Sequence, residues 1–315
     1  KALPRTARTP FLPWGVKHIG APKAWKYAKG ESVHIAVIDT GADYSHQDLR
    51  HSLGEGYNAL HPHLPPHDDN GHGTHITGTI AARNEWSGMT GVAPRAVIHP
   101  VKAFDHSGSA YIADIVSGIE WCIRKRMHII NMSFGMRHNS AAVREAVNKA
   151  RKAGIVIIAS AGNDGKIAAD YPARYPGVIC VGAATHKNGK LKMSNRGRHI
   201  HLYAPGEHVI STWPNGGYHT LSGTSMAAAY VTGAAALLLS YRPRLTANKV
   251  KRLLLESALP AQRSAQMKAG ILNVSRALRK LWSHKRYMRS GAETPIKRRT
   301  LRRTVRTQPA RARRA

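Results

Sequence analysis

A run of small residues around Ser225 places one hydroxyl where a loop is expected to become a long apolar helix ending near Tyr241. A serine at that point has an exposed side chain, and its backbone N–H belongs to the first helical turn. The free N–H groups and positive dipole end of a helix stabilise a developing negative charge, which suits a nucleophile. Because the same Gly-x-Ser-x-Ala pattern also occurs in ordinary caps and turns, its meaning depends on partners elsewhere in the chain.

Three other segments supply the groups that such a nucleophile needs. Asp39 ends a buried strand pattern, where a carboxylate can be held ionised, although turns use aspartate in the same way. His72 lies between glycines at the start of an expected helix, which keeps an imidazole accessible as a base. Asn163 follows another strand pattern, and its neutral amide can bind an oxyanion without titrating.

A metal-binding interpretation of the histidines is less favoured. His72 and His75 are three residues apart, whereas a zinc helix uses four-residue spacing with a neighbouring glutamate as base. His75 is therefore expected to be a core histidine. The histidines and prolines of residues 61–69 indicate a solvated loop.

Continuous apolar runs alternate with amphipathic patterns along the chain. We expect strands at 33–38, 96–104, 128–133, 155–159 and 178–183, with helices at 113–126 and 141–153 between them. This alternation predicts an α/β fold with a mainly parallel central sheet covered by helices on both faces. In such sheets the functional groups gather beyond the carboxyl ends of strands, where Asp39, Ser133 and Asn163 are placed.

The order Asp39, His72, Asn163, Ser225 within this pattern resembles the subtilisin-like serine proteases, the subtilases. The resemblance covers residues 14–274 and implies a three-layer subtilisin-like fold with a single catalytic domain at 14–275. It also implies a serine endopeptidase acting on protein or peptide substrates. By the resemblance, Ser225 is the nucleophile, His72 the general base and Asp39 the residue that orients it. Asn163 is the oxyanion donor.

The resemblance also suggests substrate-binding residues. Two segments are expected to pair with an extended peptide as edge strands: one contains Gly108 and Ser109, and the other contains Ser133, Phe134 and Gly135. In the alternative interpretation, their glycines only serve turns. Asp170 is expected on the floor of the S1 pocket and Asp164 at its rim. Two carboxylates there favour Lys or Arg at P1. In the alternative interpretation, Asp170 turns outward or pairs with Arg174.

A structural calcium ion is a further expectation from the family. Asp48 matches a family ligand, and Glu85 falls where the family often has an asparagine ligand. Oxygen ligands of this kind suit Ca²⁺. The amino-terminal arm lacks the matching glutamine, so an altered or absent site is the alternative. No cofactor is expected in the chemistry itself.

The chain of 315 residues carries a formal net charge of +31, and this charge is unevenly spread. From Arg276 onward, fifteen Lys and Arg residues face a single acidic residue, Glu293. Residues 276–315 are therefore interpreted as a polybasic, partly disordered extension, and residues 1–13 as an irregular arm. The basic tail suggests nonspecific, salt-sensitive contact with an anionic polymer. A polymer-binding protein with a silent protease site is the alternative function.

The remaining composition is less specific. Cys122 and Cys180 lie in apolar patterns and are expected to be buried, unpaired residues. The apolar stretch 227–239 is too short and alanine-rich for a membrane span, and we expect a core helix there. We expect a monomer. The family resemblance suggests an extracellular or cell-envelope location, with an intracellular one left open.

Overall fold

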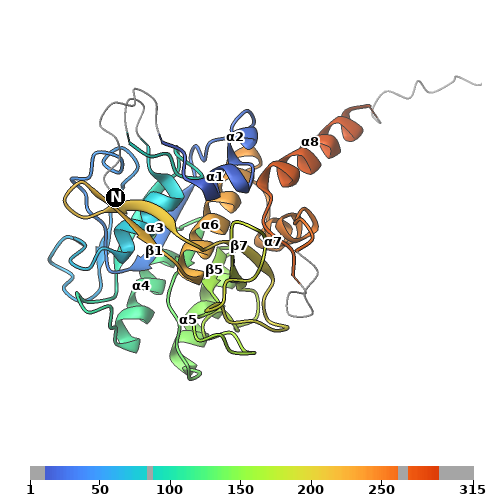
Figure 1. The fold of residues 1–315 in the computed structure, drawn as a ribbon. Coiled ribbons are helices and arrows are strands. Elements are labelled where there is room, and N and C mark those ends of the chain that lie inside the picture. Colours follow the sequence, from blue (N-terminus) through green and yellow to red (C-terminus); the bar gives the residue numbers. More distant parts are fainter. Residues whose placement is uncertain (1–10, 84–87, 262–268, 291–315) are drawn as a thin grey trace, which may run out of the picture.

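The five apolar runs form adjacent parallel strands at the centre of a computed structural model, which describes residues 11–83, 88–261 and 269–290, with side chains up to residue 283 (Figure 1). These strands are β1 (His34–Asp39), β3 (Val97–Lys102), β4 (Ile129–Met132), β5 (Val156–Ser160) and β6 (Ile179–Ala184). Two short strands, β2 (Tyr57–Asn58) and β7 (Leu202–Pro205), extend the edges, giving the order β2-β3-β1-β4-β5-β6-β7 with every neighbour parallel.

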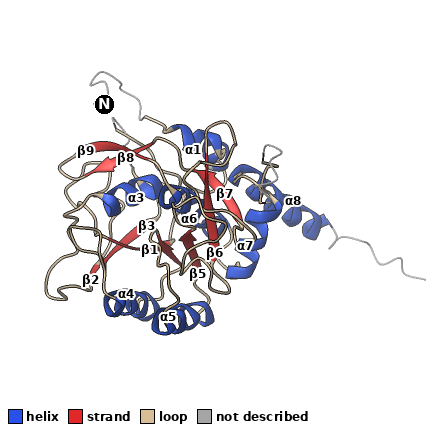
Figure 2. Cartoon of the chain, turned by 60° about the horizontal axis from the view of Figure 1, so that its bottom comes forward, coloured by secondary structure: helices blue, strands red, loops and turns tan. Residues whose placement is uncertain are grey.

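Helices cover both faces of this sheet. One face carries α4 (Ile112–Arg124) and α5 (Ala141–Lys152), and the other carries α3 (His72–Ala81) and α6 (Thr224–Tyr241), as Figure 2 shows. Both α4 and α5 bury one apolar stripe against the sheet and keep charged residues outside. The predicted three-layer α/β fold is confirmed.

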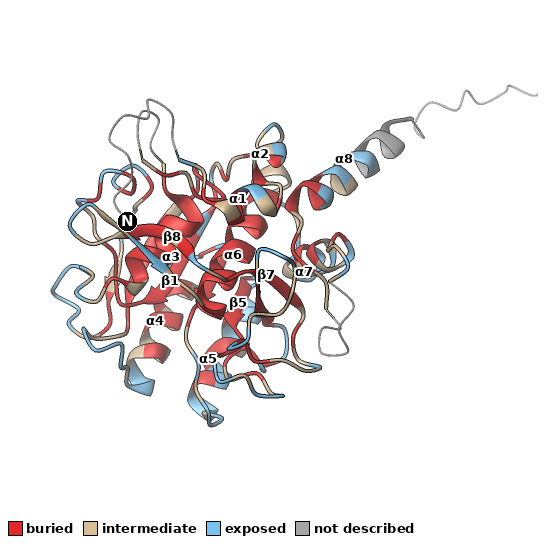
Figure 3. Cartoon of the chain, in the orientation of Figure 1, coloured by how far each residue is buried: buried red, intermediate tan, exposed pale blue. Residues whose placement is uncertain are grey.

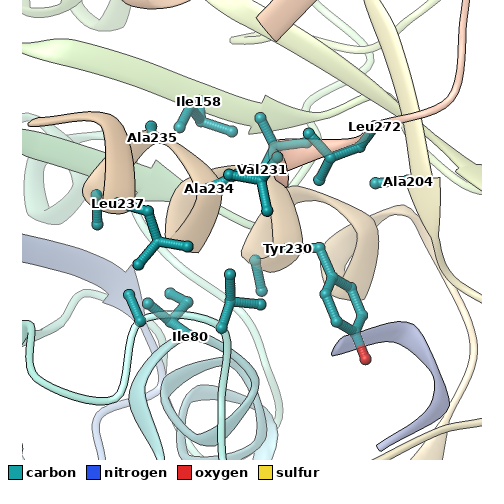
Figure 4. Packing of buried hydrophobic residues seen from close by; sticks show 14 of the residues in the cluster. Ile80, Ile158, Ala204, Tyr230, Val231, Ala234, Ala235, Leu237 and Leu272 are labelled. Atoms are coloured by element: carbon teal, nitrogen blue, oxygen red, sulfur yellow. The ribbon is translucent and has the colours of Figure 1, made fainter. Parts of the chain in front are cut away.

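The central helix α6 is buried from Thr224 to Leu239, unlike the amphipathic helices (Figure 3). Although α6 is long and apolar enough to cross a membrane by composition alone, 89% of its candidate window is buried inside the protein. Its alanines allow close packing against the sheet and α3, while Tyr230 extends from the helix toward the start of the chain (Figure 4). The apolar character of α6 is thus that of a core helix, as expected.

The remaining elements complete the α6 side of the molecule. A hairpin of β8 (Val209–Trp213) and β9 (Gly217–Leu221) packs on α3. The short helices α1 (Trp14–His18) and α2 (Ala21–Ala24) lie near α6 together with α7 (Ala247–Glu256) and α8 (Val274–Ser290). Cys122 and Cys180 are buried and unpaired, as predicted.

Helix α8 crosses the position at which the sequence suggested the start of a separate tail. Ala277 and Leu278 are completely buried in the main core, and Leu281 packs against it. Beyond these residues α8 projects away from the body (Figure 1). The packed part of the protein therefore continues past residue 275, because the apolar stripe of α8 persists among its basic residues. Residues 1–10 of the arm and 291–315 of the tail lie outside the described residues.

Candidate active site

The candidate catalytic side chains meet where three neighbouring strands end. Asp39 is the last residue of β1, Ser133 follows β4, and Asn163 comes three residues after β5. His72 begins α3, and Ser225 is the second residue of α6. Since β1, β4 and β5 are consecutive in the sheet, their carboxyl ends share one edge, and α3 and α6 both begin above it.

Asp39 and His72 form a direct hydrogen bond. His72 Nδ1 lies 2.7 Å from Asp39 Oδ1, and the side chains are 28% and 4% exposed. The backbone N–H of Thr40 also donates to this oxygen at 2.8 Å. Because a carboxylate can only accept, the proton lies on Nδ1, and Nε2 is left as the basic nitrogen.

The environment of His72 raises its pKa above 6.5. Desolvation by burial lowers this pKa, but the charge and hydrogen bond of Asp39, together with the charge of Asp68, outweigh it. Asp39 therefore stabilises the imidazolium that forms when His72 accepts a proton.

Asp68 is an important residue that the sequence analysis missed. Its Oδ1 accepts hydrogen bonds from the Thr40 hydroxyl and the Gly71 N–H, both at 2.8 Å. Its Oδ2 accepts from the N–H of Thr74 at 2.8 Å and from the Thr74 hydroxyl at 2.5 Å. This carboxylate thereby ties the end of β1 to the first turn of α3. The Asp-Asp-Asn-Gly sequence before His72 is typical of an Asx turn and was the available signal.

The Ser225 hydroxyl donates to the Ser133 carbonyl oxygen at 2.9 Å, and the Ser133 hydroxyl donates to the Ser225 carbonyl at 3.1 Å. No hydrogen bond joins Ser225 to His72, both of which belong to the described part of the chain. Catalytic hydrogen bonds often tighten only once substrate is bound. The reciprocal serine contact fixes the start of α6 to the end of β4.

The amide of Asn163 is oriented by its oxygen. Asn163 Oδ1 accepts from the backbone N–H of Thr224 at 2.9 Å and from the Thr224 hydroxyl at 3.0 Å. The NH₂ group consequently points away from Thr224. The side chain is exposed, so the amide protons are accessible to a ligand beside the first turn of α6.

A carboxylate lies between two glycine-containing segments next to this centre. Asp170 Oδ2 is 2.2 Å from the position a Cβ would take on Gly162 and 2.9 Å from that on Gly135. Asp170 therefore points inward, toward these two glycines. The Arg174 side chain lies over the Tyr171 ring, 4.8 Å from its centroid. Burial raises the pKa of Asp170, although Lys166 opposes that shift. Asp164 is exposed at the edge of the same region.

The two segments expected to pair with a peptide differ in local structure. Gly108 and Ser109 belong to a turn in which Asp105 Oδ1 accepts from the N–H groups of Ser107 at 2.8 Å and Ser109 at 3.0 Å. Residues 133–135 follow β4 outside any strand, with the Phe134 ring against Phe104. The turn at residues 105–109 matches the alternative in which the glycine serves a turn. Pairing of residues 133–135 with a peptide stays a prediction.

The expected calcium ligands are only partly described. Asp48 is completely buried, and its Oδ2 accepts from the Met89 N–H at 2.8 Å and from the Tyr218 hydroxyl at 2.6 Å. Glu85 lies outside the described residues. Among residues 11–83, 88–261 and 269–290, no group of three or more His, Cys, Asp or Glu side chains could hold a metal ion. The buried carboxylate of Asp48 supplies one oxygen ligand of the kind that suits Ca²⁺.

His75 is a core residue, as expected. It is completely buried, and its Nε2 donates to the Val209 carbonyl oxygen at 3.0 Å. Desolvation lowers its pKa to about 3, so it is neutral at ordinary pH. The metal-ligand alternative for His72 and His75 therefore has no support from their geometry, since each ring is directed to a different protein partner.

Comparison with known proteins agrees with the fold. The model of the subtilase family matches residues 30–285. The chain is 40% identical over 281 residues to a thermostable alkaline protease of Halalkalibacterium halodurans, covering 88% of this chain and 77% of the relative. It is also 40% identical over 277 residues to subtilisin DY of Bacillus licheniformis, covering 84% of this chain and 98% of that relative. The chain belongs to the subtilase family and is a subtilisin-like serine endopeptidase.

Proposed function

We propose that Ser225, His72 and Asp39 are the catalytic triad and that Asn163 stabilises the oxyanion. In the first step, Ser225 Oγ attacks the peptide carbonyl carbon while its proton moves to His72 Nε2. Collapse of the tetrahedral intermediate breaks the C–N bond, and His72 returns the proton to the leaving amine. Water then attacks the acyl-enzyme through the same two proton transfers, releasing the acid and the free serine.

The observation that carries this proposal is the His72–Asp39 hydrogen bond of 2.7 Å beside the first turn of α6. It leaves Nε2 free to act as base. The Ser225 N–H and the Asn163 NH₂ both lie at the start of α6, and together they provide two donors for the oxyanion. The match to the subtilase family and the hydrogen bond between His72 and Asp39 also argue against a binding protein with a silent site.

We further propose that the enzyme prefers Lys or Arg at P1. Asp170 is 14% exposed, and in the described part of the chain no hydrogen bond reaches its carboxylate oxygens. Desolvation of this carboxylate raises its pKa, so an incoming cation would stabilise the ionised form. A basic P1 side chain passing between Gly135 and Gly162 would reach it directly.

Peptides that differ only at P1 test this preference. For Asp170→Asn we expect kcat/KM with Arg at P1 to fall about 10- to 100-fold, the range for a partly screened ion pair near 4 Å. The value with Phe at P1 should stay within about threefold. Glu145→Gln on α5 removes the same charge from a side chain that is 70% exposed and serves as control. Equal turnover of Arg and Phe peptides by the unsubstituted enzyme would refute the proposed preference.

We propose that Asp48 contributes to a structural calcium site together with the neighbouring loop. Removal of calcium with EDTA should then lower the temperature of half-inactivation by several degrees, since a ligand that binds only the folded state stabilises it. Added Ca²⁺ should restore the original value and added Mg²⁺ should not. An unchanged thermal transition after chelation would show that Asp48 is held by its protein partners alone.

We propose that the basic tail provides an electrostatic attachment for a monomeric, extracellular or envelope-associated catalytic domain. The sequence from Arg276 is strongly basic, and α8 projects this part of the chain away from the body (Figure 1). Truncation after Ser290 should lower the salt concentration needed to elute the protein from a polyanion matrix, while peptide hydrolysis stays unchanged. Unaltered elution would place the binding surface on the catalytic domain instead.

A further inference from the structure

Three charged side chains lie close together just after Asn163. The Lys166 ammonium forms an ion pair with the Asp164 carboxylate and lies 4.0 Å from Asp170 Oδ1. Thus the two oxygens of Asp170 have different surroundings, because Oδ2 faces Gly135 and Gly162 while Oδ1 faces Lys166. The rim of the proposed S1 pocket therefore contains a positively charged side chain, Lys166.

The backbone of this loop is fixed by Asn195, a completely buried residue. Asn195 Oδ1 accepts from the N–H groups of Asp164 at 3.1 Å and Lys166 at 3.0 Å, and Nδ2 donates to the Ala161 carbonyl at 3.0 Å. The Arg196 N–H also donates to the Lys166 carbonyl at 2.8 Å. These bonds hold the Lys166 backbone within reach of the two carboxylates.

Lys166 and Asp170 differ in their exposure to solvent. The Lys166 side chain is 42% exposed, whereas that of Asp170 is 14% exposed. The ammonium thus keeps much of its hydration while it faces a carboxylate deeper in the pocket. Arg137 and Arg174 also act on Asp170, but among the described residues only Lys166 places its charge within 4.0 Å of the carboxylate. It is therefore the main internal competitor for a positively charged ligand.

We propose that Lys166 is a specificity-determining residue that serves as an internal counter-cation for Asp170. When the pocket is empty, Lys166 balances the Asp170 carboxylate, and a basic P1 side chain takes its place there while the ammonium keeps its ion pair with Asp164. With an apolar P1 residue, Lys166 stays in place and keeps the buried carboxylate balanced. Lys166 therefore widens the range of accepted peptides by reducing the advantage of Arg and Lys. This inference rests on the proposed role of Asp170 in S1.

Substitution of Lys166 tests the competition. For Lys166→Met we expect the ratio of kcat/KM for Arg over Phe at P1 to rise about 3- to 10-fold, mainly through a lower KM for the Arg peptide. Lys166→Arg keeps the charge and should leave the ratio within about twofold. Lys152→Met removes an exposed lysine at the end of α5 and controls for the change in net charge.

The double variant Asp170→Asn/Lys166→Met separates this inference from the proposed P1 preference. If Lys166 acts through Asp170, its substitution should no longer change the ratio in the Asp170→Asn background. A Lys166→Met effect that persists there, or an unchanged ratio in the single variant, overturns the inference while the preference for basic P1 stands. If Asp170→Asn alone leaves the ratio unchanged, the preference itself is wrong.

Discussion

Ser225→Ala is expected to reduce kcat for peptide hydrolysis by about 10⁶-fold, a magnitude measured for the corresponding change in subtilisin rather than calculated from this structure. The reason is that Ser225 supplies the attacking hydroxyl, whereas the neighbouring hydroxyl at the start of α6, that of Thr224, donates to Asn163 Oδ1. KM should change little, because the hydroxyl contributes mainly to the reaction and not to peptide binding. Steady-state hydrolysis of a chromogenic peptide measures the loss.

The combined variant Ser225→Ala/His72→Ala provides an internal control for this interpretation. Since nucleophile and base act in one step, the double variant should be about as slow as either single variant. Losses that multiply would show that the two residues work independently. Full proteolysis by Ser225→Ala would refute the proposed mechanism, and thermal unfolding of each variant checks that the fold is intact.

Asp39→Asn is expected to lower kcat by about 10⁴-fold while leaving the fold intact. An amide at this position can donate to His72 Nδ1, which places the imidazole proton on Nε2 and removes the base. The structure supports this effect, because the 2.7 Å hydrogen bond from Nδ1 is the contact that selects the tautomer. Asp114→Asn, in the first turn of α4, removes the same charge elsewhere and should retain activity.

The pH profile offers a second measurement on the same variant. Hydrolysis requires neutral His72, so kcat/KM should rise with pH through a midpoint above 6.5 in the unsubstituted enzyme. Desolvation lowers the pKa of His72 and Asp39 raises it, so loss of the Asp39 charge should move the midpoint to lower pH. A midpoint that does not move would show that Asp39 does not face His72 during turnover.

The elements that the sequence predicted well are those with long local patterns. The five expected strands are continuous apolar runs because they are buried on both faces of the sheet, and the structure confirms all five. By contrast, β2 has two residues, which is too short for a recognisable period, and β7 ends in a proline, a residue that argues against a strand. Their strand conformation comes from pairing with a neighbour that is distant in the sequence.

The contrast between local patterns and long-range contacts also separates the expected site residues from the missed ones. Asp39, His72, Asn163 and Ser225 each combine a reactive side chain with the end of a recognisable element. Asn195 lacks such a signal, and Asp68 has only its place in an Asx turn, because the importance of both lies in hydrogen bonds to several segments at once. Residues 105–109 form the turn of the alternative interpretation, because capping by Asp105 competes locally with strand conformation.

The sequence by itself determined the class of fold, the chemical groups available and their positions at strand and helix ends, because these depend on residue type and local period. Only the tertiary structure decided which groups meet. It placed the ends of β1, β4 and β5 side by side, directed Asp170 inward and brought Lys166 beside it. Such distances depend on packing between segments far apart in the chain, which no local pattern records.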